Sequence, residues 1–465
     1  MGISRRDWMK KLGIGGAALG AGMFTHADVV TETEMVTDGD PDYASFARNL
    51  FKIDPTMKDV PSAFIRDGKV IQPARELPVF SEVDVAVVGG GPAGFAAAVA
   101  AARTGAKVAL IERYGSLGGL FTNGMVLIIL GTCVRENNEL KLYTAGICEE
   151  FMRRLSGMGD DAITKYPKGY GQPTIDPEAG KVLMDEMIAE AGVEMFFHSW
   201  GVDVIQDGNK VQGVIFESKQ GRQAVLAKCV VDATGDGDIN FLAGGTYQQI
   251  THALGFVYQV GNSDRINSHV TPDGKGAKVS LGAGEPIRAL RWKNNLGPRG
   301  NGLDVRELSK TEVMHRKSVW NKTRRDKETP GFGNIYLSQT CSQIGVRATR
   351  LLGGVTRIDK KGAGEGATFA DTVAYSGDDH GYQKGFAIPY GSLLPAQVDN
   401  LLCAGRCISC APDLIDRVRL IGPCFVTGHA AGVGAALAAK NGVVPRAVPP
   451  ADIQRVLREQ GAYLG

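Results

Sequence analysis

Charge imbalance is almost absent from this sequence. Its 52 lysines and arginines stand against 50 aspartates and glutamates, which leaves a formal net charge of +2 over 465 residues. No basic stripe with interleaved aromatic residues is present, so nothing indicates nucleic acid as a partner. Internal repeats and low-complexity blocks are missing as well. With 43% hydrophobic residues, the chain is long enough to bury a large core in one to three domains.

Motifs of several enzyme classes are also missing. The sequence has no P-loop, no nucleophile elbow, no zinc-ligand spacing and no C-x-x-C-H for a c-type haem. Its eight cysteines are ordinary usage for this length and do not form a disulfide scaffold. The sequence therefore predicts no metal site.

The first residues have the order of an export signal. Arg5 and Arg6 precede a weakly apolar run from Leu12 to Phe24, and a small-residue cleavage site follows at Ala27. A membrane-spanning helix would need about 20 apolar residues, more than this run offers. The paired arginines resemble the bacterial twin-arginine signal, which carries folded proteins. We expect an exported protein, periplasmic or extracellular; a disordered basic terminus and an uncleaved anchor are the alternatives.

A dinucleotide-binding fingerprint begins at Val83. The apolar run to Val88 predicts a buried parallel strand, and Gly89, Gly91 and Gly94 follow as G-x-G-x-x-G. Pro92 suits the first turn of the alanine-rich helix that comes next, and a second strand ends at Glu112. In this motif the glycines allow a tight turn, close approach of the pyrophosphate and close helix packing, and the acid accepts ribose hydroxyls. A glycine-rich turn that binds nothing is the alternative.

Further glycine-rich segments favour FAD over NAD. Residues 113–126 form a second glycine-rich strip, residues 229–238 read as a strand that enters a glycine turn, and residues 400–407 read as a strand that ends in Gly-Arg. Several separate segments suit the longer, extended FAD molecule. Residues 422–442 then predict an uncharged helix, and we expect it to be buried against the sheet rather than to span a membrane. Its N-terminus is expected to point at the isoalloxazine ring and to stabilise negative charge there.

Taken together, these segments resemble FAD-dependent oxidoreductases of the glutathione-reductase-like superfamily, over roughly residues 84–440. The matching motifs include Leu117-Gly-Gly119, Asp232-Ala-Thr-Gly235, Ala404-Gly-Arg-Cys407 and Thr427-Gly-x-Ala-Ala-Gly432. The resemblance implies an α/β fold, with a Rossmann-like three-layer FAD-binding domain built from discontinuous segments and an interposed mixed α+β substrate domain. It also implies that FAD is held by a defined set of residues: Gly89, Gly91, Pro92, Ala93, Gly94, Glu112, Arg113, Gly118, Gly119, Thr122, Thr234, Gly235, Gly405, Arg406 and Gly432.

Three residues are candidates for chemistry beside the flavin. His429, in the last long helix, is predicted to accept a proton or to supply positive charge, with a core histidine as the alternative. Arg419, just before that helix, is predicted to hold an anionic substrate or a reduced flavin, unless it makes an ordinary ion pair. His252 is a weaker candidate, and so are His380 and Tyr382 in a polar loop.

Four cysteines crowd into 22 residues: Cys403, Cys407, Cys410 and Cys424. They suit a redox dithiol or an iron–sulfur cluster by count alone. Because they fall in apolar segments, we expect buried, inert thiols instead.

The expected organisation places the flavin domain in three pieces of chain. An export signal (1–27) and an N-terminal extension (28–80) come first. The flavin domain takes 81–130, 196–246 and 396–442, a helical insert takes 131–195, a substrate domain takes 247–395, and a C-terminal helix occupies 443–465.

The predicted function is that of a flavin-dependent dehydrogenase or reductase that transfers a hydride between a small-molecule substrate and FAD. The expected electron acceptor is a quinone, a carrier protein or oxygen, because no second fingerprint for a nicotinamide nucleotide is found. No transmembrane span is expected in the mature chain, and homo-oligomer formation is left open. The alternatives are a redox-neutral flavin-dependent isomerase or lyase, and a flavin electron-carrier subunit of a larger complex.

Overall fold

The computed structural model describes residues 62–137, 139–164, 166, 173–263, 283–287, 289–377 and 384–465. The chain divides into two units, Met1–Arg75 and Glu76–Gly465, and each is described by itself. The predicted export signal, residues 28–61 of the predicted extension, His380 and Tyr382 lie outside the described residues. The described part of the first unit is an antiparallel hairpin of β1 (Phe64–Arg66) and β2 (Lys69–Ile71).

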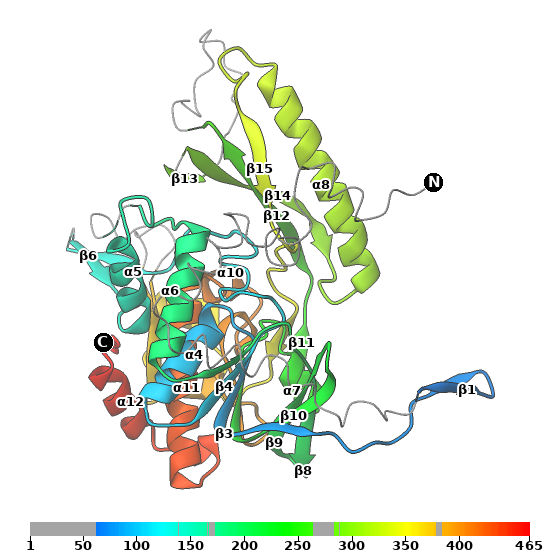
Figure 1. Cartoon of the computed structure of the whole chain (residues 1–465). Helices are drawn as coiled ribbons and strands as arrows, with labels where there is room; N and C mark the ends of the chain where they lie inside the picture. The colour runs from blue at the N-terminus through cyan, green and yellow to red at the C-terminus, as the bar shows by residue number, and fades with distance from the viewer. Residues whose placement is uncertain are drawn as a thin grey trace, which may run out of the picture. The chain divides into compact units, whose positions relative to one another are not determined.

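A parallel-rich sheet forms the centre of the second unit (Figure 1). Its strand order is β7-β4-β3-β10-β9-β8, and β19 also pairs with β10. The pairs β3–β4, β4–β7, β3–β10 and β10–β19 are parallel, whereas β9 pairs antiparallel with β8 and β10. The strand bounds are β3 (Val79–Val88), β4 (Val108–Ile111), β7 (Glu194–Phe196), β8 (Trp200–Asp207), β9 (Lys210–Ser218), β10 (Gly221–Asp232) and β19 (Leu401–Cys403).

Both faces of this sheet are covered, so the unit has three layers there. Because side chains alternate along a strand, Val85 and Val87 of β3 join one core while Ala86 and Val88 join the other. The first core contains helices α4 (Pro92–Arg103) and α11 (Ile421–Asn441). The second contains residues of β9 and of the short helix α7 (Asp238–Leu242). The predicted α/β class with a Rossmann-like three-layer core is confirmed.

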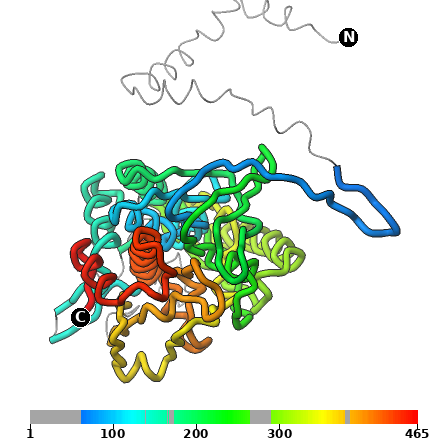
Figure 2. The backbone as a smooth tube through the Cα atoms, turned by 90° about the horizontal axis from the view of Figure 1, so that it is seen from below, coloured from blue at the N-terminus to red at the C-terminus, as the bar shows by residue number. Residues whose placement is uncertain are grey.

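Helices α4 and α11 pack with almost no space between their backbones. A Cβ atom added at Gly428 would lie 2.0 Å from the carbonyl oxygen of Ala93, and one at Gly432 would lie 2.2 Å from that of Ala97. Glycine is therefore required at both positions of α11. Among the described helices, α11 has the length and composition to cross a membrane, but its apolar part, up to Ala439, is buried within the fold. Figure 2 shows α11, in orange-red, with the red α12 (Pro450–Glu459) beside it.

The insert between β4 and β7 contains two helices and a hairpin. Helix α5 (Ile147–Ser156) and helix α6 (Pro177–Glu190) follow the hairpin of β5 (Cys133–Glu136) and β6 (Glu139–Leu142). The Asp176 side chain begins α6 by accepting hydrogen bonds from the backbone N–H groups of Glu178 and Ala179. Residues 131–195 were expected to be helical. The structure has two helices there and also a hairpin that the sequence did not predict.

A second, antiparallel sheet lies in the region predicted to bind substrate. Its order is β13-β14-β12-β15, with β12 (His252–Gly261), β13 (Ala283–Ile287), β14 (Leu290–Gly300) and β15 (Tyr336–Thr340). The long helix α8 (Val305–Lys327) runs along this sheet (Figure 1). The remaining elements are β11 (Tyr247–Gln249), β16 (Arg350–Leu352), α9 (Lys360–Glu365), β17 (Thr372–Ser376), β18 (Phe386–Pro389), α10 (Ile415–Val418) and the 3-10 turns at Tyr390–Ser392, Gly405–Cys407 and Pro445–Ala447.

Candidate functional site

A pocket that opens to solvent lies where β3, β4, β10 and β19 end. The carboxyl edge of a parallel sheet is where open α/β folds bind their ligands. The pocket is lined by residues from the sheet edge, from the starts of α4 and α11, and from the segment after β15.

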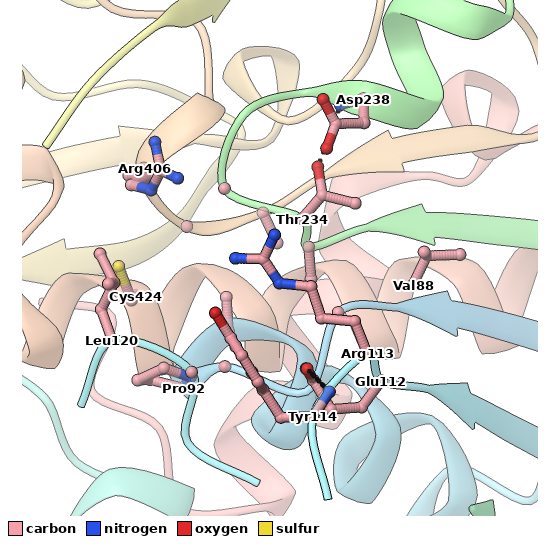
Figure 3. A pocket seen from close by; sticks show the side chains of 18 of the residues that line it. Val88, Pro92, Glu112, Arg113, Tyr114, Leu120, Thr234, Asp238, Arg406 and Cys424 are labelled. Carbon is pink, nitrogen blue, oxygen red and sulfur yellow. Dashed lines mark hydrogen bonds between the residues drawn. The ribbon is translucent and has the colours of Figure 1, made fainter. Parts of the chain in front are cut away.

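Twelve of the predicted site residues line the pocket. They are Gly89, Gly91, Pro92, Ala93, Glu112, Arg113, Gly119, Thr234, Gly235, Gly405, Arg406 and Arg419. Residues far apart in the chain, from 89 to 419, therefore meet around one space. Figure 3 shows how several of their side chains point into it.

The glycine turn after β3 leaves the start of α4 open to a ligand. Gly89 has a φ of +99°, and a Cβ there would lie 2.5 Å from the Ala233 carbonyl oxygen. Gly91 begins α4 without a side-chain cap, and a Cβ there would meet nothing within 4 Å. The first backbone N–H groups of α4 therefore remain available to an anion, and the helix dipole favours a phosphate at this end.

Glu112 ends β4 with its side chain buried. Its carboxylate oxygens accept hydrogen bonds from the backbone N–H of Gly90, at 2.5 Å, and of Tyr114, at 2.8 Å. Burial raises the pKa of Glu112, although these two hydrogen bonds act in the opposite direction. Two N–H donors do not exhaust the lone pairs of a carboxylate, so Glu112 can still accept ribose hydroxyls.

Arg113, Tyr114 and Gln343 form a polar group on the pocket wall. The Arg113 guanidinium lies over the rings of Tyr114 and Trp200, 4.8 and 4.9 Å from their centroids. The Gln343 side-chain oxygen accepts hydrogen bonds from both Arg113 and the Tyr114 hydroxyl. Gln343 and Tyr114 were not predicted from the sequence. Gln343 follows β15, and its approach to β4 depends on the tertiary fold alone.

A buried ion pair fixes the turn after β10. The Arg406 guanidinium donates to both carboxylate oxygens of Asp236, at 2.6 and 2.7 Å, and Thr349 donates to the same carboxylate. Gly235 has a φ of +79°, and a Cβ there would lie 2.6 Å from Arg406 Nε. Arg406 thus lines the pocket with its charge already paired, so it shapes the cavity and does not offer a free positive charge.

Asp232, at the end of β10, supports the same turn. This fully buried carboxylate accepts hydrogen bonds from the N–H and hydroxyl of Thr234 and from the Asn240 N–H. Burial raises the pKa of Asp232 to about 6, since the hydrogen bonds compensate only part of the lost hydration. These bonds hold Thr234 against the pocket.

Helix α11 begins on another side of the pocket from Glu112, and Figure 3 shows Cys424, in its first turn, well apart from Glu112. Ile421 and Cys424 in its first turn line the cavity, no side chain caps the helix, and the Gly422 N–H donates to the Leu130 carbonyl at 3.0 Å. Thr427 accepts a hydrogen bond from the Gly405 N–H, at 3.1 Å, which joins the helix to the turn after β19. The dipole of a long helix that begins at a cavity presents partial positive charge to whatever lies there.

Arg419 lies just before α11 and lines the pocket beside it. Its guanidinium donates to Asp416 Oδ1 from Nε, at 2.9 Å, and from Nη2, at 2.6 Å. The Nε2 atom of His252 lies 3.3 Å from the same oxygen. His252 itself does not line the pocket, so its predicted role beside the flavin changes to that of a neighbour of Arg419 and Asp416.

His429 does not face the pocket, and its predicted catalytic role is corrected. The residue lies in the middle of α11 with 1% of its surface exposed, and its Nε2 is 2.9 Å from the Gln460 side-chain oxygen. Burial lowers the pKa of His429 to about 4, which keeps the imidazole neutral. The alternative interpretation, a core histidine, is the one that the geometry supports.

Four predicted cofactor-binding residues also lie outside the pocket lining. Gly432 packs against α4 about two turns further along α11 than Cys424, beyond the residues that line the pocket. Gly94 packs against Gly89, where a Cβ would lie 1.7 Å from the carbonyl oxygen. Gly118 and Thr122 shape the turn that carries Gly119 and Leu120, with Thr122 donating to the Leu117 carbonyl at 2.5 Å. These residues support the site without lining it.

The eight cysteines are free and buried. Burial raises the pKa of Cys410 and of Cys424 to about 12, so both thiols stay protonated at neutral pH. In the described part of the chain, no group of three or more histidine, cysteine, aspartate or glutamate side chains is arranged to hold a metal ion. These surroundings agree with the expectation of buried, unreactive thiols.

Sheet, glycine turn, buried acid and helix N-terminus together define a Rossmann-type dinucleotide-binding protein. The chain belongs to the FAD dependent oxidoreductase family, whose model matches residues 84–254 and 278–457. The protein is therefore an FAD-dependent enzyme, and the residues of the pocket fit that cofactor. Glu112 suits the ribose, the start of α4 suits the diphosphate, and the start of α11 suits the electron-rich end of the isoalloxazine ring.

Individual relatives match over shorter stretches. Dihydrolipoyl dehydrogenase of Trypanosoma brucei brucei is 51% identical over 49 residues, 10% of either chain. Thiamine thiazole synthase of Pyrococcus abyssi is 28% identical over 165 residues, 34% of this chain and 58% of that protein. The chain thus spans 10% and 58% of the length of these two curated relatives. A geranylgeranyl bacteriochlorophyll reductase-like protein of Thermoplasma acidophilum, a solved structure, is 16% identical with a TM-score of 0.45, covering 82% of this chain and 84% of that one.

Proposed function

We propose that this protein is a dehydrogenase or reductase that transfers a hydride between a small-molecule substrate and FAD. The observation that supports the proposal is that the α11 N-terminus, with Ile421 and Cys424, lines the pocket well apart from Glu112 (Figure 3). A reduced flavin is anionic at its pyrimidine end, and the partial positive charge of a helix N-terminus stabilises such an anion. A protein that only stored FAD would have no need of this arrangement.

The residues of the chain have distinct tasks in this proposal. The start of α4 and Glu112 bind and orient the cofactor, and the Arg406–Asp236 pair keeps the pocket in shape before binding. FAD, when bound, supplies the hydride-accepting chemistry. Arg419 is the charged side chain beside α11 that is placed to orient a substrate at that end.

The electron acceptor is proposed to be a quinone, a carrier protein or oxygen. The sequence offers one dinucleotide fingerprint, at Gly89 to Gly94, and this one is taken by FAD. A regular nicotinamide donor would need a second binding site of its own.

An anaerobic substrate screen tests this function. Purified holoenzyme is mixed with candidate small molecules without oxygen, and the yellow flavin absorbance is followed. Bleaching by a substrate, with recovery when a quinone or oxygen is added, is the expected result. Rapid bleaching by NADH would contradict the proposed acceptor. Turnover without any flavin reduction would favour a redox-neutral isomerase or lyase instead.

We further propose that the protein leaves the cytoplasm already folded around FAD. The support is the adjacent Arg5 and Arg6 at the head of an apolar, glycine-rich run. Replacing both by lysine should keep the uncleaved protein in the cytoplasm, whereas Lys11→Arg should not. Fractionation of cells followed by mass measurement of the mature N-terminus distinguishes these outcomes.

A further inference from the structure

Three basic side chains lie near one another beside the start of α11, and one of them lines the pocket. Arg419 lines the pocket between α10 and α11, His252 begins β12, and Arg347 lies in the segment after β15. Asp416 of α10 adds a carboxylate, which accepts both hydrogen bonds from Arg419 and lies 3.3 Å from His252. We call these four residues the basic cluster.

The basic cluster has more positive than negative charge. Arg347 and Arg419 are both guanidinium ions, which stay protonated in proteins, whereas Asp416 contributes a single negative charge. One positive charge is therefore in excess even when His252 is neutral. Burial lowers the pKa of His252, in spite of the neighbouring Asp416 carboxylate, which favours that neutral form.

The excess charge lies at Arg347. Among the residues that the structure describes, its guanidinium has no hydrogen-bond or ion-pair partner, although the side chain is partly buried. Burial and the neighbouring Arg419 charge both lower the pKa of Arg347, and only Asp416 acts against them. A guanidinium that is partly removed from water normally has an anionic partner.

The backbone holds Arg347 in place before any ligand arrives. Gly255 and Gly345 exchange two backbone hydrogen bonds, of 3.0 and 2.6 Å, which tie the segment after β15 to β12. The Ile344 N–H donates to the Glu312 side chain at 2.5 Å, and Thr349 donates to Asp236. The antiparallel pairing brings the chain after Gly345, with Arg347, alongside the chain before Gly255, with His252. Gln343, in the same tied segment, lines the pocket.

The diphosphate of FAD is not the partner that Arg347 lacks. That group suits the start of α4, at Gly91 and Pro92, whereas Arg419 lines the pocket beside Ile421 at the start of α11. Arg347 is outside the pocket lining, and the Gly255–Gly345 pairing places it alongside His252, whose Nε2 lies 3.3 Å from the Asp416 carboxylate that Arg419 binds. A ligand that reaches both arginines therefore lies at the α11 end of the pocket, where the substrate of the proposed reaction is expected.

We propose that the substrate is a carboxylate, which Arg347 and Arg419 bind at the α11 end of the pocket. A planar guanidinium donates two parallel hydrogen bonds to a carboxylate, which gives both affinity and a fixed orientation. Arg419 keeps its bonds to Asp416 and is thereby oriented, and Arg347 gains the anionic partner that the fold withholds. This specificity proposal rests on the proposed oxidoreductase function.

Titration of the holoenzyme with simple carboxylates tests the site. Acetate, benzoate and succinate are the probes, with benzamide and succinamide as uncharged matches at constant ionic strength. Binding is followed by the change in flavin absorbance and, independently, by calorimetry. The variants are Arg347→Gln and Arg347→Lys, with Arg455→Gln as the control because Arg455 is an exposed residue of α12 paired with Glu459.

The expected result is saturable binding of at least one carboxylate and none of the amides. Arg347→Gln should weaken that binding by about tenfold to a hundredfold, as expected for loss of a charge-assisted hydrogen bond, and Arg347→Lys should weaken it less. Arg455→Gln should bind as the parent does, and all variants should keep the same FAD content. Failure of all carboxylates to bind, equal binding of the amides, or unchanged binding by Arg347→Gln would each overturn the proposal.

The two proposals fail in different ways. If the holoenzyme reduces no substrate and accepts no electrons, the oxidoreductase function fails while calorimetry still decides whether Arg347 binds carboxylates. If substrates bleach the flavin but carboxylates bind no better than amides, the function stands and the carboxylate site is wrong.

Discussion

Arg406 and Asp236 are 170 residues apart in the chain and form a two-pronged ion pair with contacts of 2.6 and 2.7 Å. Both side chains are largely buried, with 13% and 18% of their surface exposed. The pair joins the turn after β10 to the turn after β19, and both turns line the FAD pocket. One contact thus holds two of the separate chain segments around the cofactor.

Replacing either Arg406 or Asp236 alone should destabilise the protein more than replacing both. Arg406→Met or Asp236→Leu alone leaves a buried unpaired charge and should lower the free energy of unfolding by about 3–5 kcal/mol. The double variant should recover part of that loss, because no charge then remains. Urea unfolding of the four proteins measures the coupling, and FAD content after gel filtration reports the pocket. Additive single effects would show that the pair does not act as a unit.

Glu112 should determine how tightly FAD is held. Glu112→Ala removes the acceptor of the Gly90 and Tyr114 N–H groups as well as the proposed acceptor of the ribose hydroxyls. We expect FAD to bind about tenfold to a thousandfold more weakly, since two buried donors lose their partner. Fluorescence titration of the apoprotein with FAD measures this. Glu459→Gln, at an exposed position of α12, is the control and should bind as the parent does.

Gly428 should not tolerate a methyl group. Gly428→Ala places a Cβ 2.0 Å from the Ala93 backbone oxygen, so α4 and α11 must separate. Overpacking of this kind lowers the free energy of unfolding by about 1–3 kcal/mol or more. Gly364→Ala is the matched control, because a Cβ there meets nothing within 4 Å and helical alanine is favoured. Thermal unfolding of both variants should give opposite shifts.

His429 should make the protein less stable in mild acid. The ordinary histidine pKa of 6.5 applies to the unfolded chain, whereas burial lowers the pKa in the folded protein to about 4. The unfolded state therefore takes up a proton first, and the free energy of unfolding falls as the pH drops from about 6.5 to about 4. The full effect is about 3 kcal/mol.

Replacement of His429 separates this effect from other titrations. His429→Gln should lose the contribution of His429 to the pH dependence over that interval and keep the flavin spectrum, because the residue does not line the pocket. His198→Asn, at an exposed histidine with a φ of +54°, should keep the dependence. A flavin spectrum that changes in His429→Gln would restore a role for His429 at the cofactor.

The parts of the site predictable from sequence are those set by local geometry. The turn from Gly89 to Gly94 and the acid at Glu112 lie within one strand–helix–strand unit, so their spacing fixes their positions. Gln343 and Arg347 reach the site only through the pairing of Gly255 with Gly345, which spacing along the chain does not encode. Arg419 was found because it directly precedes a recognisable helix.

Helix α11 is buried on all sides, so its pattern of residues does not tell which of them reach the pocket. His429 faces Gln460 instead, and Gly432 lies about two turns beyond Cys424, where it packs against α4. Helix α8 went unrecognised for the opposite reason. Its buried positions are Thr311, His315, Val319 and Thr323, and only one of these is apolar. Hydrophobic periodicity identifies a helix, and its buried face, when one face is apolar and the other is polar.

The late position of β19 and α11 in the chain sets an order of events during synthesis. Strands β3, β4 and β10 are made before residues 405–424, which contribute Gly405, Ile421 and Cys424 to the pocket wall. A nascent chain that ends before Leu401 therefore lacks one wall of the FAD site. We expect FAD to be enclosed only after these later residues have been made and folded.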